Sequence, residues 1–227
     1  MEFVYDTEQE EIQKSKKILS PKEFLLSHPR GVYTLGTYSE PSDFNHHLDR
    51  LIKAVHDFYN DHIDRHKLWK LIKFTASVVQ QKFRFTLLIF KNFSFVLCLY
   101  ADEPIKNNYY RSLWVYGQPR ENPHIKETGW IRKRRYITDK MPKNFQEAIL
   151  SLDGYFYEGT TCNICFVFES GIKTPHGNLV LPGLYLKKVE NLCKNLKIPF
   201  QQDMISFADL KNCIGIFITS MFLIFKL

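Results

Sequence analysis

Residues 141–186 contain several groups that could together bind an anionic ligand with a ring nitrogen. Glu158 follows the strand predicted at residues 155–157 and precedes Gly159, and its carboxylate could accept a hydrogen bond from a protonated ring nitrogen. Pro182 and Gly183 end the preceding strand, and a helix is predicted to begin directly after them. Free N–H groups at the start of a helix bind phosphate. Taken singly, a solvated loop glutamate and an ordinary turn before a helix are the more common interpretations.

Three more side chains belong to types that bind phosphate in other proteins. Arg50 lies on a predicted amphipathic helix, and its guanidinium could bind phosphate through two parallel hydrogen bonds. A surface arginine without such a role is equally common. Thr219 and Ser220 lie in an apolar segment, where hydroxyl groups require a partner. They could bind the same phosphate, or they could hydrogen-bond to their own chain.

The composition is that of a globular protein and restricts the class of partner. Of the 227 residues, 44% are hydrophobic and 24% are charged, which argues against disorder and allows one large or two small domains. The net charge of +7 would suit an anionic ligand, although a solvated basic surface is the simpler explanation. The sequence contains no long Lys/Arg block of the kind that would indicate a nucleic-acid partner.

The cysteines and the chain ends indicate a cytoplasmic protein without a metal. Cys162 and Cys165 have CxxC spacing, but no second pair and no histidine at ligand spacing accompany them, so no metal is expected. The five cysteines lie mostly in apolar segments, as expected for reduced, buried thiols. Residues 1–17 lack the apolar segment of a signal peptide, and the apolar residues 213–225 are too few to span a membrane.

The hydrophobic pattern predicts an α+β fold in two unequal halves. Residues 1–28 are predicted to be a polar helical lead-in, with a short helix from Pro21 through Leu26. Further helices are predicted at residues 45–63, 66–81, 184–196 and 205–210. Strands are predicted at residues 31–38, 84–90, 94–100, 111–116, 148–152, 155–157, 163–169, 172–174 and 215–225. A Pro/Gly-rich loop follows residue 116 and is interpreted as a linker between the halves.

A series of short motifs occurs in the order and at the spacing of one known family. They are G-V-Y-T at 31–34, H-x-x-R-L at 47–51, P-R-x-N-P-x-x-K at 119–126, E-A-I-L at 147–150, D-G-x-x-x-E-G-x-x-x-N at 153–163, T-P at 174–175, L-P-G at 181–183, K-I-P at 197–199 and F-I-T-S at 217–220. Over roughly residues 25–220 the chain resembles the class IV pyridoxal-phosphate aminotransferases. That family includes branched-chain aminotransferases, D-amino acid transaminases and aminodeoxychorismate lyases.

The resemblance implies a fold-type IV enzyme with two domains. A small N-terminal α/β domain would span residues 1–118, and an inter-domain loop would span 119–124. Residues 125–227 would form a larger, cofactor-binding pseudobarrel domain. Because family members usually continue through further strands beyond the position of Ser220, the resemblance implies that this domain is truncated at its C-terminal end.

The resemblance also assigns roles to individual residues. Lys126, which precedes Glu158 by 32 residues, matches the lysine that forms a Schiff base with pyridoxal 5'-phosphate. Glu158 matches the carboxylate that keeps the pyridine nitrogen protonated, and Tyr33 matches a tyrosine that faces the substrate. The positions that match the phosphate-binding groups are Arg50, the N–H groups of Leu184 and Tyr185, and Ser220. Two more positions, Thr161 and Asn163, match the segment that lies behind the cofactor's pyridine ring in the family.

These assignments imply a transaminase that moves an amino group between a small amino acid and a 2-oxo acid, assembled as a homodimer in the cytoplasm. Two alternatives remain, a lyase of the same fold that acts on aminodeoxychorismate and a truncated, catalytically impaired paralogue. The sequence departs from the family pattern at Tyr185 and Met221, where a small hydroxyl residue is more common. An arginine for the substrate carboxylate is not evident just before the inter-domain loop, which leaves Arg120 as a candidate.

Overall fold

The chain forms two compact units, and each is described by itself. The structure is a computed structural model and describes residues 2–6, 11–14, 21–27, 30–38, 41–79, 83–90, 95–101, 112–220 and 223–226. Unit 1 comprises Met1–Pro104 and Ile125–Arg132, and unit 2 comprises Ile105–His124 and Lys133–Leu227. The division of the chain at a loop of residues 119–124 stays a prediction.

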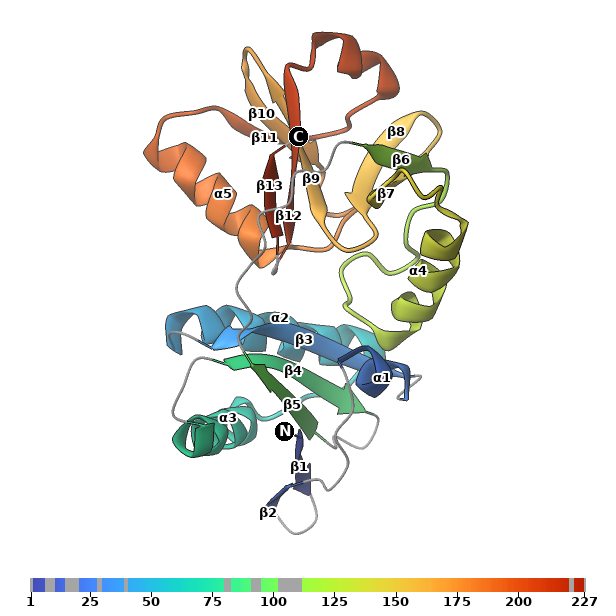
Figure 1. Cartoon of the computed structure of the whole chain (residues 1–227). Coiled ribbons are helices and arrows are strands. Elements are labelled where there is room, and N and C mark those ends of the chain that lie inside the picture. Colours follow the sequence, from blue (N-terminus) through green and yellow to red (C-terminus); the bar gives the residue numbers. More distant parts are fainter. Residues whose placement is uncertain are drawn as a thin grey trace. The chain divides into compact units, whose positions relative to one another are not determined.

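Unit 1 is built on an antiparallel sheet with the strand order β2-β1-β5-β4-β3. Its strands are β1 (Glu2–Asp6), β2 (Glu11–Lys14), β3 (Gly31–Tyr38), β4 (Phe83–Phe90) and β5 (Phe95–Ala101). Its helices are α1 (Pro21–Leu26), α2 (Pro41–Tyr59) and α3 (Arg65–Val79). Figure 1 shows α2 running along β3.

Helix α2 buries the apolar face that its sequence predicts. Leu48, Leu51 and Val55 recur at helical spacing and are each at most 1% exposed. Burying one such side chain contributes about 1.5–3 kcal/mol to folding. They share a core with Phe44 of the same helix, with residues of α3, β3 and β4, and with Ile125. The core therefore fixes α2 against the strand that carries Tyr33.

Unit 2 contains two sheets. In the three-stranded sheet, β6 (Leu113–Tyr116) runs parallel to β7 (Glu147–Leu152), which pairs antiparallel with β8 (Tyr155–Gly159). The five-stranded sheet has the order β11-β10-β9-β12-β13. Its strands are β9 (Asn163–Phe168), β10 (Gly171–Pro175), β11 (Phe200–Asp203), β12 (Gly215–Ser220) and β13 (Leu223–Lys226).

The described part of the second half of the chain also contains the helices α4 and α5 (Figure 1) and the 3-10 helix η1. Helix α4 (Thr128–Lys140) begins in unit 1 and continues in unit 2. Helix α5 (Leu184–Asn195) contacts β12, and the 3-10 helix η1 (Phe207–Asn212) precedes that strand. None of the helices within the described ranges is long and apolar enough to cross a membrane.

The turn between β7 and β8 confirms a prediction from the sequence. Asp153 and Gly154 have φ angles of 52° and 80°, so both central residues adopt the positive φ that a two-residue hairpin turn of type I′ requires. The turn brings the end of β8 back along β7. Glu158, near the end of β8, therefore lies within one sheet with Glu147 at the start of β7.

Two predictions of secondary structure are wrong. Residues 2–6 and 11–14, predicted as part of a helical lead-in, form the hairpin of β1 and β2, and β1 pairs with β5. Pairing with a strand so distant in sequence outweighs the weak local preference for helix. The single strand predicted at 215–225 is instead β12 and β13, which pair antiparallel. The predicted turns at Ser39-Glu40 and Lys91-Asn92 lie outside the described residues.

Candidate functional site

In unit 1, a threonine hydroxyl connects an arginine to a buried histidine. The Arg50 Nη2 atom donates to Thr34 Oγ1 at 2.9 Å, and Thr34 Oγ1 lies 2.9 Å from His47 Nδ1. His47 is 2% exposed, and its ring packs against those of Phe44 and Phe85. We call Arg50, Thr34 and His47 the arginine cluster. The hydroxyl directs the guanidinium without neutralising its charge.

Lys126 is fixed to strand β3 by the backbone. The Tyr33 N–H donates to the Lys126 carbonyl at 2.8 Å, and Gly31 N donates to Thr128 Oγ1 at 3.0 Å. The Lys126 Nζ atom lies 5.4 Å from the centroid of the Tyr33 ring. Lys126, Tyr33 and Arg50 therefore all belong to unit 1, and a backbone hydrogen bond holds Lys126 beside Tyr33 of β3.

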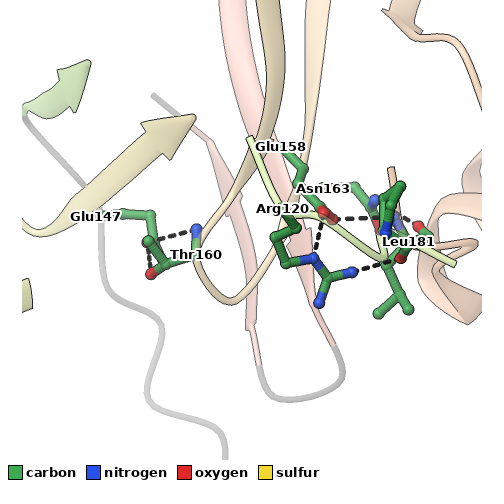
Figure 2. Close-up of polar contacts among 7 residues, drawn as sticks. Arg120, Glu147, Glu158, Thr160, Asn163 and Leu181 are labelled. Atoms are coloured by element: carbon green, nitrogen blue, oxygen red, sulfur yellow. Dashed lines mark hydrogen bonds and ion pairs between the residues drawn. The ribbon is translucent and has the colours of Figure 1, made fainter. Parts of the chain in front are cut away.

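In unit 2, Glu158 forms a buried ion pair with Arg120 (Figure 2). The Arg120 Nε atom lies 2.8 Å from Glu158 Oε1, and the side chains are 6% and 5% exposed. The other oxygen, Oε2, accepts a hydrogen bond from the Leu181 N–H at 3.1 Å. The Asn163 Nδ2 atom donates to the Leu181 carbonyl at 2.8 Å, so Leu181 is held from both sides. We call Arg120, Glu158, Leu181 and Asn163 the carboxylate cluster.

The carboxylate cluster extends to the start of helix α5. Gly183 is the N-cap residue of this helix and provides no side-chain hydrogen bond to its first turn. A Cβ atom at Gly183 would collide with Asn163 Oδ1, so glycine is required for the close approach. The N–H groups of Leu184 and Tyr185 belong to this first turn, where helix geometry provides no intrahelical acceptor.

Strand register distinguishes the two hydroxyl residues at the end of β12. Thr219 lies directly opposite Asn163 of β9, and opposite residues in an antiparallel pair share a face of the sheet. Thr219 is 1% exposed, and its Oγ1 has no hydrogen-bond partner among the residues that the structure describes. Because neighbouring side chains alternate, Ser220 belongs to the other face. Thr219 therefore shares the face on which Asn163 reaches the α5 N-terminus.

A second buried carboxylate shapes the turn between β8 and β9. Glu147 Oε1 accepts hydrogen bonds from the backbone N–H of Thr160 at 3.1 Å and from its hydroxyl at 2.5 Å. Its Oε2 accepts one from the hydroxyl of Thr161 at 2.5 Å. The predicted cofactor residue Thr161 thus contacts Glu147 and is itself exposed.

The thiol of Cys162 is buried beside these two carboxylates. Burial, followed by the charges of Glu147 and Glu158, raises the pKa of the Cys162 thiol well above its usual value.

The structure therefore brings together, within unit 2, the predicted residues Glu158 and Asn163 and the start of α5. The sequence pattern predicts no role for Glu147, and it indicates Arg120 only as a candidate for a substrate carboxylate. In the structure the Arg120 Nε pairs with Glu158 and its Nη2 donates to the Pro123 carbonyl at 2.5 Å, and a role of Arg120 at a substrate carboxylate stays a prediction. The described residues contain no group of three or more His, Cys, Asp or Glu that could hold a metal ion.

The groups in unit 2 fit the chemistry of pyridoxal phosphate. A carboxylate offers about four lone-pair sites, so the contacts of Glu158 with Arg120 and Leu181 are compatible with a further donor such as a ring N–H. The first turn of α5 has no side-chain cap and offers N–H donors for a phosphate. The Thr219 hydroxyl, which has no hydrogen-bond partner within the described part of the chain, lies on the same face of the sheet as Asn163. Donors for an anion and an acceptor for a cation thus meet in one cluster.

Comparisons with known proteins identify relatives in sequence and in fold. The chain is 26% identical over 116 residues to a probable branched-chain-amino-acid aminotransferase of Rickettsia typhi, and the match covers 49% of this chain and 40% of that protein. A putative branched-chain amino acid aminotransferase of Thermotoga maritima has a similar fold, with a TM-score of 0.77, 20% identity, and coverage of 100% of this chain and 86% of that one.

A third protein, a branched-chain amino acid aminotransferase of T.th. in complex with N-(5'-phosphopyridoxyl)-L-glutamate, has a TM-score of 0.79. It is 14% identical, and the match covers 99% of this chain and 84% of that one. The sequence model of the amino-transferase class IV family matches residues 33–222, which include both clusters and Lys126. The chain belongs to the class IV aminotransferase family.

Proposed function

We propose that this protein transfers an amino group between a small amino acid and a 2-oxo acid, with pyridoxal phosphate bound through Lys126. The observation that carries the proposal is the carboxylate cluster, in which the buried Glu158 adjoins the uncapped first turn of α5. Family membership supports the proposal, and so does the phosphopyridoxyl compound bound by one of the structural relatives. Pyridoxal phosphate, when bound, supplies an electron sink for the electrons of the substrate's α-carbon.

The proposed roles of unit 1 are anchoring, proton transfer and phosphate binding. The Lys126 amine would hold the cofactor and would move the proton of the substrate's α-carbon, so one side chain would act as anchor and general base. Tyr33, whose ring lies beside Lys126 Nζ, faces the substrate. Arg50 binds the phosphate with a guanidinium that Thr34 directs.

The proposed roles of unit 2 are to hold the ring nitrogen and the phosphate. Glu158 keeps a proton on the ring nitrogen, and Asn163 fixes Leu181, whose N–H holds Glu158. The N–H groups of Leu184 and Tyr185 bind the phosphate, together with a hydroxyl of the Thr219-Ser220 pair. Thr161 acts through Glu147, by fixing the turn that follows β8.

Homodimeric assembly and a cytoplasmic location belong to the same proposal. Cys162, Cys165, Cys193 and Cys213 are free thiols, which suits a reducing compartment. Light scattering of the purified protein tests the dimer, and a fluorescent fusion of the full chain tests the location.

The cofactor proposal is tested by absorbance spectroscopy. The purified protein is expected to acquire a visible absorption band when pyridoxal phosphate is added, and borohydride is expected to abolish it. Lys126→Ala is expected to lose the band. Lys140→Ala removes an exposed lysine of α4 and is the matched control, which is expected to keep it.

Amino-group transfer is then measured with pairs of small amino acids and 2-oxo acids. Transfer by the wild-type protein and its loss in Lys126→Ala are expected. A band that persists in Lys126→Ala contradicts the assignment of the lysine, and the absence of a band in wild type contradicts the cofactor. Release of pyruvate from aminodeoxychorismate without amino transfer would contradict the proposed reaction.

A further inference from the structure

The ion pair between Arg120 and Glu158 lies inside the proposed ring-nitrogen site. Both side chains are more than nine-tenths buried, and their charged atoms are 2.8 Å apart. Arg120 also donates to the Pro123 carbonyl, which fixes the guanidinium within the loop of residues 119–124. A carboxylate and a guanidinium that are both removed from water stabilise each other only while both are charged. Arginine stays protonated under all conditions in which proteins fold.

The other titratable groups near Glu158 do not offset this positive charge in the same way. Glu147 is engaged by the backbone and hydroxyl of Thr160 and by Thr161, on the turn after β8. The thiol of Cys162, on the same turn, is kept protonated by burial, which raises its pKa. Arg120 contacts Glu158 directly, so its charge acts at the shortest distance.

We propose that Arg120 shares the charge of Glu158 and thereby lowers the affinity of the cofactor's ring nitrogen for a proton. This inference rests on the proposed function, in which Glu158 faces that nitrogen. A carboxylate with its full charge would favour a protonated ring strongly, because an opposite charge within about 4–6 Å stabilises the charged form. A fixed cation beside the same carboxylate opposes a second cation there, so Arg120 is a positioning and tuning residue.

The consequence concerns the strength of the electron sink. A protonated ring withdraws electrons from the substrate's α-carbon more strongly than a neutral ring does. By sharing the charge of Glu158, Arg120 sets the protonation of the ring nitrogen between the fully protonated and the fully neutral state. The charge of position 120, rather than its size, is therefore expected to control the protonation of the ring.

The test uses pyridoxal phosphate labelled with ¹⁵N in the ring and bound to the full-length protein, with the ¹⁵N chemical shift as the readout of ring protonation. Arg120→Gln removes the charge and keeps a hydrogen-bond donor, and it is expected to raise the protonated fraction at a given pH. Arg120→Lys keeps the charge and is expected to leave that fraction close to wild type. Glu158→Gln is expected to lower it.

Arg135→Gln is the matched control, because it makes the same substitution in unit 2 at an exposed arginine that pairs with Asp139. It is expected to leave the ring nitrogen unchanged. An unchanged shift in Arg120→Gln overturns the inference, as does a shift toward the neutral ring, which would mean that Arg120 only holds Glu158 in place. If Arg120→Gln does not fold, Arg120→Lys decides, since a large change there contradicts control by charge.

Failure of the proposed function is distinguishable from failure of this inference. If the wild-type protein gives no visible band with pyridoxal phosphate, the proposed function fails and no ring signal is observed. If the band is present and the ¹⁵N chemical shift of the ring does not change with the charge at position 120, only the proposed role of Arg120 fails.

Discussion

The arginine cluster of unit 1 and the carboxylate cluster of unit 2 hold a charged side chain in different ways. In unit 1 the partly exposed Arg50 is directed by the hydroxyl of Thr34. In unit 2 the buried Glu158 is paired with a full opposite charge and a backbone N–H. A neutral contact sets direction at little energetic cost, whereas a buried ion pair makes stability depend on both partners. The contact with Arg50 thus serves orientation in unit 1, whereas the contacts of Glu158 also serve folding in unit 2.

The largest expected effect is on the stability of unit 2. Glu158→Ala leaves the Arg120 guanidinium buried without its carboxylate, and the free energy of unfolding is expected to fall by about 3–5 kcal/mol. Urea denaturation measures the loss. The double variant Arg120→Met/Glu158→Leu replaces the pair with apolar side chains and is expected to recover most of it. Equal losses in the single and double variants would show that burial of charge is not the cause.

The next effect concerns the close approach of Gly183 to Asn163. In Gly183→Ala, the new methyl group would collide with Asn163 Oδ1, and overpacking of this kind costs about 1–3 kcal/mol. Thermal unfolding measures the cost. Introducing the same substitution into Asn163→Ala, which removes the colliding amide, is expected to cost much less. If the two costs are the same, the start of α5 is not limited by this contact.

Alkaline pH is expected to weaken unit 2 through a buried thiol. Burial raises the pKa of Cys165 to about 12, from 9.0, so above pH 9 the unfolded chain loses a proton that the folded chain keeps. The stability contributed by this group is therefore present below pH 9 and falls by about 1.4 kcal/mol per pH unit between 9 and 12. Urea denaturation of wild type and Cys165→Ala at pH 8.5–10.5 measures the difference, and identical slopes would exclude this origin.

The smallest effect is expected in the arginine cluster. Thr34→Val removes the hydroxyl that directs Arg50, and the affinity for pyridoxal phosphate is expected to fall about fivefold, which corresponds to a loss of about 1 kcal/mol. Affinity for pyridoxal, which lacks the phosphate, is expected to be unchanged. Thr34→Ser is expected to restore binding, and Thr86→Val alters another buried threonine of the same sheet as a control. Equal losses for both ligands would point to a general disturbance of the sheet.

Local sequence patterns predict the elements of this protein better than its long-range contacts. The apolar spacing of α2 and the Asp153-Gly154 turn are encoded within a few residues, and the structure confirms both. The hairpin of β1 and β2 was missed because β1 pairs with β5, which lies far along the chain. Helix α4 was not predicted at all, since its charged residues leave a weak apolar pattern.

In the candidate site, too, local motifs are predicted better than contacts between distant residues. Motif order identified Glu158, Asn163 and the start of α5, and the structure brings these three together. The partner of Glu158 was not predicted, because Arg120 lies in a loop and no local pattern connects it to β8. The role of Glu147 is not predicted either, although a glutamate at the start of a mostly apolar strand indicates a buried carboxylate that needs partners.

The pairing of β9 with β12 has a consequence for the order in which the protein assembles during synthesis. Asn163 and Thr219, which face each other in this pair, are separated by 56 residues. At about 5–20 residues per second, a ribosome completes β12 roughly 3–11 s after β9, whereas a hairpin such as β7–β8 closes within microseconds. The apolar strand β9 therefore waits for seconds with one edge unpaired. That interval is when the nascent chain is most open to aggregation and to capture by chaperones.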